Sequence, residues 1–237
     1  MIGLQIDKSC LMIKKEEAFE NTTQKKLSDI IKNTIGNKNF RNVIILTVIW
    51  DIAKFMTFGF MGVYKTKDLA MPLSVIQGIS MVAMIARMIV TIPFGKLSDK
   101  KSYAKCMEVA FFVAAISFFI NVFVVPERWW LIIAFTVVFE MSQAGIGQNV
   151  TNISYSYVKE EYIVYSMVIR NCIGGLFGFG ASILASKILE NIQGNNNMIF
   201  GVDCYAQQFL SLISFVVVIV TILFDRFVVE KQKVIIQ

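Results

Sequence analysis

Charged side chains interrupt several apolar stretches of the sequence. They are Asp51, Lys54, Arg87, Glu140 and Arg170. A charge at the centre of a bilayer costs about 2.5–3.5 kcal/mol on insertion scales unless it is paired or hydrated, so such residues commonly serve a solute or ion pathway. We interpret them as candidates for a substrate or ion path. Ion pairs that only fix helix packing are the alternative interpretation.

Amide side chains extend this pattern after Glu140. Gln143 and Asn149, together with Gln148 and Asn152, predict a polar face that continues along the same helix. A helix surrounded by lipid does not carry such a stripe, because each polar group would lose its hydration. We therefore expect this face to border a water-filled path or a partner helix.

Counting 1.5 Å per residue along a helix gives the depth of each charge. The count places Asp51, Glu140 and Arg170 near one depth, Lys54 one turn further out, and Arg87 nearer the inner surface. Asp51 and Lys54 are three residues apart, so they are expected to share a helix face and to pair. The simplest arrangement of the central charges is mutual pairing across a hydrated cavity.

Other chemistry is largely excluded by composition. The chain has no His, and its four Cys form no CxxC pair, which argues against a structural zinc site and against an imidazole relay. It contains no phosphate-binding loop, no GxSxG, no HExxH and no dinucleotide fingerprint. We expect no enzymatic activity, no cofactor and no metal, and we expect the Cys residues to be reduced, buried and apolar in role.

The elements that position these residues are long apolar stretches. Hydrophobic residues make up 56% of the 237 residues, and the mean hydropathy is +0.62. An apolar stretch of about 20 residues crosses the hydrocarbon core. We predict an all-α polytopic membrane protein with six transmembrane helices in a domain of residues 42–229, after a cytoplasmic tail (1–41) and before a second tail (230–237). The predicted spans are 42–64, 70–94, 103–125, 129–150, 162–187 and 206–229.

The Lys and Arg residues predict the orientation. The net charge of +6 does not indicate nucleic-acid binding, because the Lys residues cluster in short segments between apolar runs. Four segments expected on one side (1–41, 96–105, 151–161 and 225–237) hold 16 Lys and Arg, against 4 in the segments on the other side. The positive-inside rule places both termini in the cytoplasm, and the membrane is expected to be the plasma (inner) membrane. Trp129 and Trp130 are expected to anchor the outer interface.

The first tail carries its own pattern. Leu27, Ile30, Ile31 and Ile35 recur at helical spacing and are flanked by Lys. This predicts a short amphipathic helix on the inner leaflet. A solvated linker is the alternative.

A motif lies between the second and third predicted spans, in the segment 93–103. Gly95 lets two helices cross closely, and Asp99 is placed to cap a helix or to pair with a cation. The segment resembles the cytoplasmic signature of the major facilitator superfamily, G-x-L-[SA]-D-[RK]-x-[GS]. The matching residues are Gly95, Leu97, Ser98, Asp99, Lys100 and Ser102. The usual basic residues are missing at Tyr103 and Ala104, a weakening that is typical of the family's C-terminal half.

The resemblance covers about residues 24–230 and implies a function. It implies one six-helix half, built as two inverted three-helix repeats, of a secondary transporter that moves a small-molecule substrate by alternating access. The first, second, fourth and fifth spans would line the path, and a second six-helix half, from another chain or a second copy, would be the partner. Gly174 and Gly178 indicate close helix packing, or else a hinge. The alternatives are a six-span subunit of an ATP-driven transporter and a non-transporting scaffold.

Overall fold

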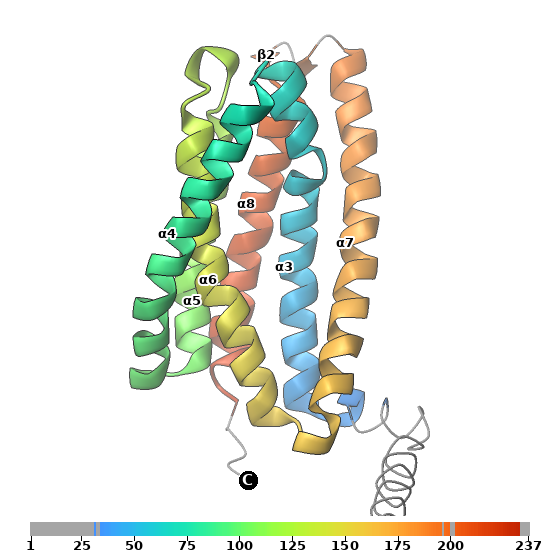
Figure 1. Cartoon of the computed structure of the whole chain (residues 1–237). Coiled ribbons are helices and arrows are strands. Elements are labelled where there is room, and N and C mark those ends of the chain that lie inside the picture. Colours follow the sequence, from blue (N-terminus) through green and yellow to red (C-terminus); the bar gives the residue numbers. More distant parts are fainter. Residues whose placement is uncertain (1–30, 32–33, 196, 200–201, 233–237) are drawn as a thin grey trace, which may run out of the picture.

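The computed structural model describes residue 31 and residues 34–195, 197–199 and 202–232. Within these residues six helices are long and apolar enough to cross a membrane, which confirms the predicted all-α six-span protein (Figure 1). The helices are α3 (Lys38–Val63), α4 (Leu73–Lys100), α5 (Tyr103–Val122), α6 (Leu131–Tyr157), α7 (Ile163–Gly194) and α8 (Ala206–Phe224). π-helical turns extend α3 over Tyr64–Asp68 and α8 over Asp225–Val229, and 3₁₀ turns occupy Pro126–Arg128 and Glu160–Tyr162.

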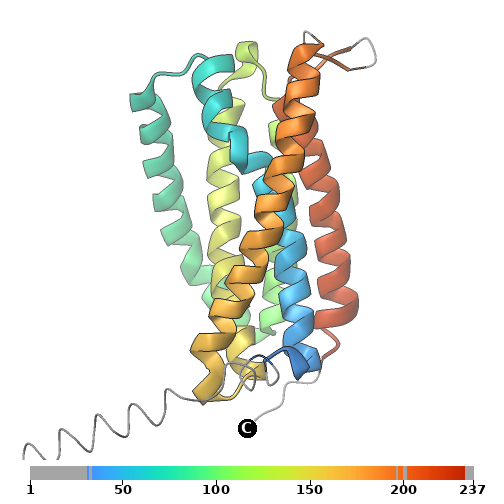
Figure 2. The same ribbon diagram turned by 90° about the vertical axis from the view of Figure 1, so that its right-hand side faces the viewer.

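Among the described residues the strands are a small antiparallel pair, β1 (Met198–Ile199) and β2 (Val202–Asp203), between α7 and α8. Figure 2 shows this pair beside the end of α7 and above α8.

Three of the helices are longer than hydropathy predicts. α4 continues to Lys100, α6 to Tyr157 and α7 to Gly194. The apolar run ends where the hydrocarbon ends, whereas the backbone hydrogen bonds continue into the polar layer. The expected loop 96–105 is therefore only the turn Lys101–Ser102, and most of the motif is helical.

The packing relates the first three helices to the last three. α3 packs mainly on α7 and α8, α6 packs on α4 and α5, and α5 packs on α8. Exchanging α3 with α6, α4 with α7 and α5 with α8 converts this set of contacts into itself. Three spans reverse the direction of the chain, so the two units are inverted relative to each other, as the predicted repeats require.

An aromatic cluster holds α3, α5 and α6 together. Trp50 stacks on Phe139 with ring centroids 6.2 Å apart and lies 5.5 Å from Phe111. Phe118 and Phe135 pack beside them, and the centroids of these two rings are 6.3 Å apart. These rings are buried, and aromatic contacts at such distances stabilise packing beyond the area they bury.

The ends of the bundle separate the two sets of connecting segments. The start of α3, the turn at Lys101–Ser102, the turn before α7 and the end of α8 lie at one end, called the lower end here (Figure 1). The predicted amphipathic helix falls mostly outside the described residues. Close to it in the sequence, the buried hydroxyls of Thr34 and Ser166 are hydrogen-bonded at 2.9 Å. This bond attaches the segment before α3 to α7.

Candidate functional site

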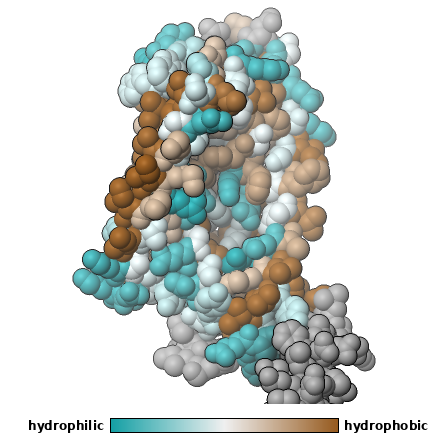
Figure 3. All heavy atoms as spheres, viewed as in Figure 1, coloured by the Kyte–Doolittle hydropathy of each residue, from teal (hydrophilic) through white to brown (hydrophobic). Residues whose placement is uncertain are grey.

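Four helices border an open, concave face of the bundle. α3, α4, α6 and α7 lie toward the viewer in Figure 1, and α5 and α8 lie behind them. Figure 3 shows the same face hollowed at its centre, with hydrophilic residues around the hollow and apolar residues along the α4 edge. We call this surface the open polar face.

An ion pair between α4 and α6 lies on the open polar face. Arg87 Nη1 is 3.1 Å from Glu140 Oε2, and the side chains are 47% and 26% exposed. Arg87 lies at the middle of the 28-residue α4, level with Glu140. The expectation that Arg87 lies nearer the inner surface was wrong, because α4 extends six residues past its predicted end.

Arg170 lies lower on the same face and reaches from α7 to α6. Its Nη1 donates to Ser154 Oγ at 3.1 Å and to the Val150 carbonyl at 3.4 Å. Its Nη2 donates to Asn171 Oδ1 at 3.1 Å. Among the described residues Arg170 forms no ion pair at contact distance, although its charge interacts with that of Asp51. Of the expected pairings of the central charges, only Arg87–Glu140 is a direct contact.

Asp51 and Lys54 do not pair as expected. The Asp51 carboxylate packs directly on Gly174 of α7, where a Cβ would collide with it. The Lys54 ammonium lies 5.6 Å from the centroid of the Phe55 ring. The α3–α7 contact turns Asp51 toward α7, which explains why three-residue spacing alone does not produce the pair.

Two glycines of α7, Gly174 and Gly178, are packing residues. Phe55 lies against Gly178, and Ser182 lies against Gly59, one turn further up. The contacts between the parallel helices α3 and α7 thus repeat every four residues, starting from Asp51 and Gly174. This confirms the close-packing interpretation of the Gly174/Gly178 spacing.

The motif residues divide between the buried interface and the exposed end of α4. Ser98 is buried and hydrogen-bonds to Asn149 Oδ1, while Asn149 Nδ2 donates to the Gly145 carbonyl at 2.7 Å. A Cβ on Gly95 would lie 3.4 Å from Gln148 Nε2, which fits the predicted close crossing. Asn149 was predicted to lie on the path. It is instead buried, because it turns toward α4.

Asp99 does not cap a helix. Ser102 is the N-cap of α5 and accepts from the Lys105 amide at 3.1 Å. Asp99 and Lys100 are exposed, and neither has a hydrogen bond or an ion pair to another described residue. Because α4 extends to Lys100, α5 begins only at Tyr103. The N-cap is the residue directly before the first helical residue, and here that residue is Ser102 and not Asp99.

Two amides of α6 keep unused hydrogen-bonding capacity. Gln143 Nε2 and Gln148 Oε1 are buried and have no hydrogen-bond partner in the described part of the chain. Gln143 is one turn from Glu140 on the same helix face. Both atoms lie inside the helix packing and not at the surface of the open polar face.

The sequence interpretation missed a polar stripe on α8. Gln207 Nε2 donates to the Thr57 carbonyl at 2.8 Å, and Ser214 Oγ donates to the Ala53 carbonyl at 2.7 Å. Ser211 Oγ accepts from Asn121 Nδ2 at 2.6 Å. These side chains are buried against α3 and α5. Their spacing of four and three residues was the available signal, but hydroxyls hardly lower the hydropathy of this span.

The cysteines are free thiols wherever the structure describes them. Cys106 is buried and donates to the Phe94 carbonyl at 3.4 Å, Cys204 is half-buried, and Cys172 is exposed. The expectation that all are buried was wrong for Cys172. Burial raises the pKa of the Cys204 thiol, so it stays protonated. No group of metal-binding side chains occurs among the described residues.

Comparisons with protein-family models, with curated proteins and with solved structures find no match to this chain. The function is therefore argued from the open polar face itself.

Proposed function

We propose that this chain is one six-helix half of a secondary transporter, similar in plan to the C-terminal half of a major facilitator superfamily protein. The open polar face would form its side of the solute path. The observation that carries the proposal is the partly exposed Arg87–Glu140 pair at the middle of α4. A charged pair at this depth is stable beside water or a partner protein and unfavourable beside lipid.

The groups around the pair favour a small polar solute. Arg87 and Arg170 supply donors, and Glu140 supplies an acceptor. Charges of both signs are present. The face therefore suits a small solute with both donors and acceptors and selects no single charge.

A second six-helix half would close the path. α4 and α7 border the open polar face and are the least buried of the six helices. Both expose large apolar side chains, such as Met88 and Ile92 on α4 and Phe179 and Ile183 on α7. In a two-fold arrangement α4 of one half packs on α7 of the other, and rocking between the halves gives alternating access. The partner is a second copy or another chain.

The short lower-end connections favour this proposal over an ATP-driven transporter subunit. Only Lys101–Ser102 separate α4 from α5, and a short 3₁₀ turn lies between α6 and α7. These segments offer little surface to a nucleotide-binding partner. Copurification of such a partner with the chain would contradict the proposal.

The lower end is proposed to face the cytoplasm of the plasma (inner) membrane. Lys96, Lys100, Lys101 and Lys105 lie around the turn at that end, and the positive-inside rule assigns it to the cytoplasm. In intact cells, a membrane-impermeant thiol reagent should label a cysteine introduced at Trp130 and leave one at Lys100 unlabelled. Labelling at position 100 would reverse the assignment.

The transport proposal is tested by the accessibility of the open polar face to water. Gly147, two turns from Glu140, and Gly175 of α7 both have open space where a Cβ would lie. In a background without native cysteines, thiols at these positions should react with a membrane-impermeant reagent added to either side of reconstituted vesicles. A thiol at lipid-facing Val216 is the control and should not react.

Protection of both glycine positions from both sides would indicate a closed scaffold and would contradict the proposal. Reaction from one side only, unchanged by any solute, would indicate a static vestibule. A stable, transport-competent monomer would contradict the need for a second half.

A further inference from the structure

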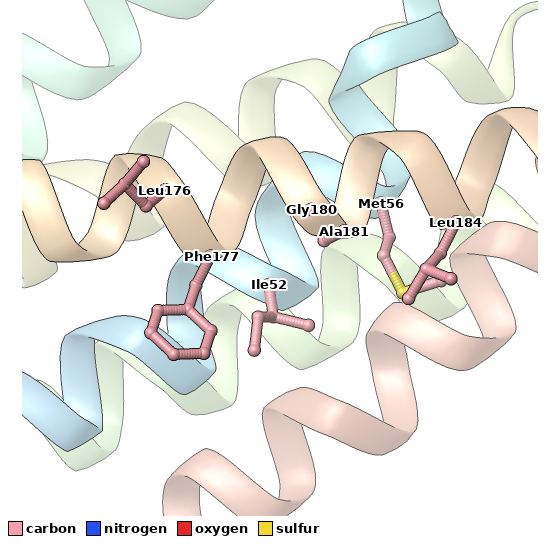
Figure 4. A pocket seen from close by; sticks show the side chains of 7 residues that line it. All are labelled: Ile52, Met56, Leu176, Phe177, Gly180, Ala181 and Leu184. Carbon is pink, nitrogen blue, oxygen red and sulfur yellow. The ribbon is translucent and has the colours of Figure 1, made fainter.

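An apolar groove runs along α7 on the side away from the open polar face. It has a volume of about 380 Å³, and Ile52 and Met56 of α3 and Phe177, Gly180 and Leu184 of α7 line it (Figure 4). Met56 and Ala181, which line the groove, form a buried cluster with Leu210 of α8. The groove therefore lies on the side of α7 that faces α8 and opens to the surrounding bilayer.

The floor of the groove is firm and its rims are exposed. Met56, Ala181 and Leu210 form a small buried cluster beneath it, which ties α3, α7 and α8 together. Phe177 and Leu184 are more than half exposed. Gly180 has open space at its Cβ position, so the missing side chain leaves the depression open.

The groove begins near the middle of α7 and extends toward its upper end. α7 has 32 residues and is about 48 Å long, so it exceeds a hydrocarbon core of about 30 Å by about 9 Å at each end. Lys187 is about 10 Å from the upper end of α7 and so lies at the boundary of the hydrocarbon. Gly180 lies about 10 Å deeper, which is the depth of an acyl chain.

Lys187 stands directly above the groove. It follows Leu184 by three residues and Gly180 by seven, so all three share one side of α7. The Lys187 side chain is exposed and forms no ion pair with another described residue, while neighbouring Glu190 accepts a hydrogen bond from Ser186 at 3.3 Å. A cation at the headgroup level thus sits above an apolar channel.

We propose that this groove is a phospholipid-binding site, in which one acyl chain lies along Gly180 and the lipid phosphate pairs with Lys187. The lining offers no side-chain hydrogen bond to a polar ligand, and the opening faces the bilayer, which supplies acyl chains. The acyl chain fills the depression by van der Waals contact, and the attraction between the phosphate and the Lys187 ammonium fixes the position of the lipid along α7. The proposal does not depend on transport.

The test uses a photoactivatable phosphatidylcholine with a diazirine in its acyl chain, in nanodiscs that contain the full chain. Adducts mapped by mass spectrometry should concentrate on the groove residues of α3 and α7. Gly180→Phe fills the depression and should remove most of these adducts. Phe112→Trp, a bulky change on the exposed surface of α5 outside the groove, is the control and should leave them unchanged.

The headgroup contact is tested separately with Lys187→Gln. It should lower the groove adducts about fivefold, the effect expected from losing one lysine–headgroup attraction of about 1 kcal/mol. Lys67→Gln, an exposed lysine at the same end of the bundle, is the control and should have no effect. Lys187→Gln is a conservative surface change, so it keeps the proposal testable even if Gly180→Phe fails to fold.

Two results would overturn the site. Adducts spread evenly over exposed apolar residues such as Met88 and Val216 would show unspecific solvation by lipid. Adducts on the groove that neither Gly180→Phe, in a folded protein, nor Lys187→Gln reduces would show that neither depression nor cation selects the lipid.

Discussion

The helix pairs α3–α7 and α4–α6 each run parallel and each join one helix of both inverted units. The exchange that relates the two units converts one pair into the other, but the pairs are built from different contacts. In α3–α7, Phe55 packs against Gly178, and Asp51 packs against Gly174 without an ion pair among the described residues. In α4–α6, Phe94 packs against Gly145, and an Arg87–Glu140 pair and a Ser98–Asn149 hydrogen bond lie above and below it.

The shared element is an aromatic ring against a glycine, and the difference lies in the polar groups. Glycine packing brings the helices together in both pairs, so it serves the fold. Among the described residues a close ion pair occurs only between α4 and α6, where it remains partly exposed and so is available for function. The corresponding charges Asp51 and Arg170 of the other helix pair interact without a close contact. Symmetric features thus mark structure, whereas asymmetric polar features mark the candidate site.

The largest expected effect comes from filling the two glycine contacts. A Cβ at Gly145 would lie 2.6 Å from the Ala110 Cβ and 2.9 Å from the Phe94 ring, on two different helices. Gly145→Leu should therefore destabilise the protein by about 3 kcal/mol, at the upper end of the effect of overpacking. Gly178→Leu meets a single ring, that of Phe55, which can turn, so we expect about 1–2 kcal/mol.

Unfolding of purified protein in mixed micelles measures both values. Gly147→Leu and Gly175→Leu, at positions with open space, are the controls on the same helices and should change stability by less than about 0.5 kcal/mol. Equal losses of stability for Gly145→Leu and Gly178→Leu would contradict the expectation that the Phe55 ring can move aside whereas the neighbours of Gly145 cannot.

An intermediate effect is expected at the ion pair. Arg87→Glu places two carboxylates together, and Glu140→Arg places two guanidinium groups together. Each should destabilise the protein by about 1 kcal/mol, since interhelical polar contacts in membranes have about this value. The double reversal should restore most of the loss, as shown by a double-mutant cycle.

Further outcomes of the charge variants show whether the ion pair serves stability, solute movement or neither. Arg170→Gln keeps donors near Ser154 and Val150, so we expect a smaller loss than at Arg87. If the double reversal restores stability but not solute movement, the pair serves the path. If neither the single reversals nor the double reversal changes stability or solute movement, the difference between the helix pairs α3–α7 and α4–α6 has no functional meaning.

The smallest effect distinguishes two residues at the end of α4. Ser102→Ala removes the N-cap of α5 and should cost about 1 kcal/mol. Asp99→Ala removes an exposed group without a partner among the described residues and should stay within about 0.5 kcal/mol. A larger loss for Asp99→Ala in the same unfolding assay would indicate a contact formed only in another conformation or with the second half.

The sequence predicted the six spans because hydrocarbon thickness acts on each helix separately. It underestimated α4, α6 and α7 because helices continue where hydropathy falls. Pairing is a property of two helices together, so the Arg87–Glu140 contact could not be predicted without knowing that α4 and α6 run side by side. Asn149 shows the same limit, since only the packing of α6 on α4 turns it inward.

The buried polar stripe of α8 has a consequence for biosynthesis. α8 is the last of the six helices to leave the ribosome, and its Gln207 and Ser214 donate to carbonyl groups of α3, while Asn121 of α5 donates to Ser211. Until α8 arrives, Asn121 faces lipid without this acceptor. A chain that stops before Ala206 therefore leaves the Asn121 amide inside the membrane without its hydrogen-bond acceptor on α8.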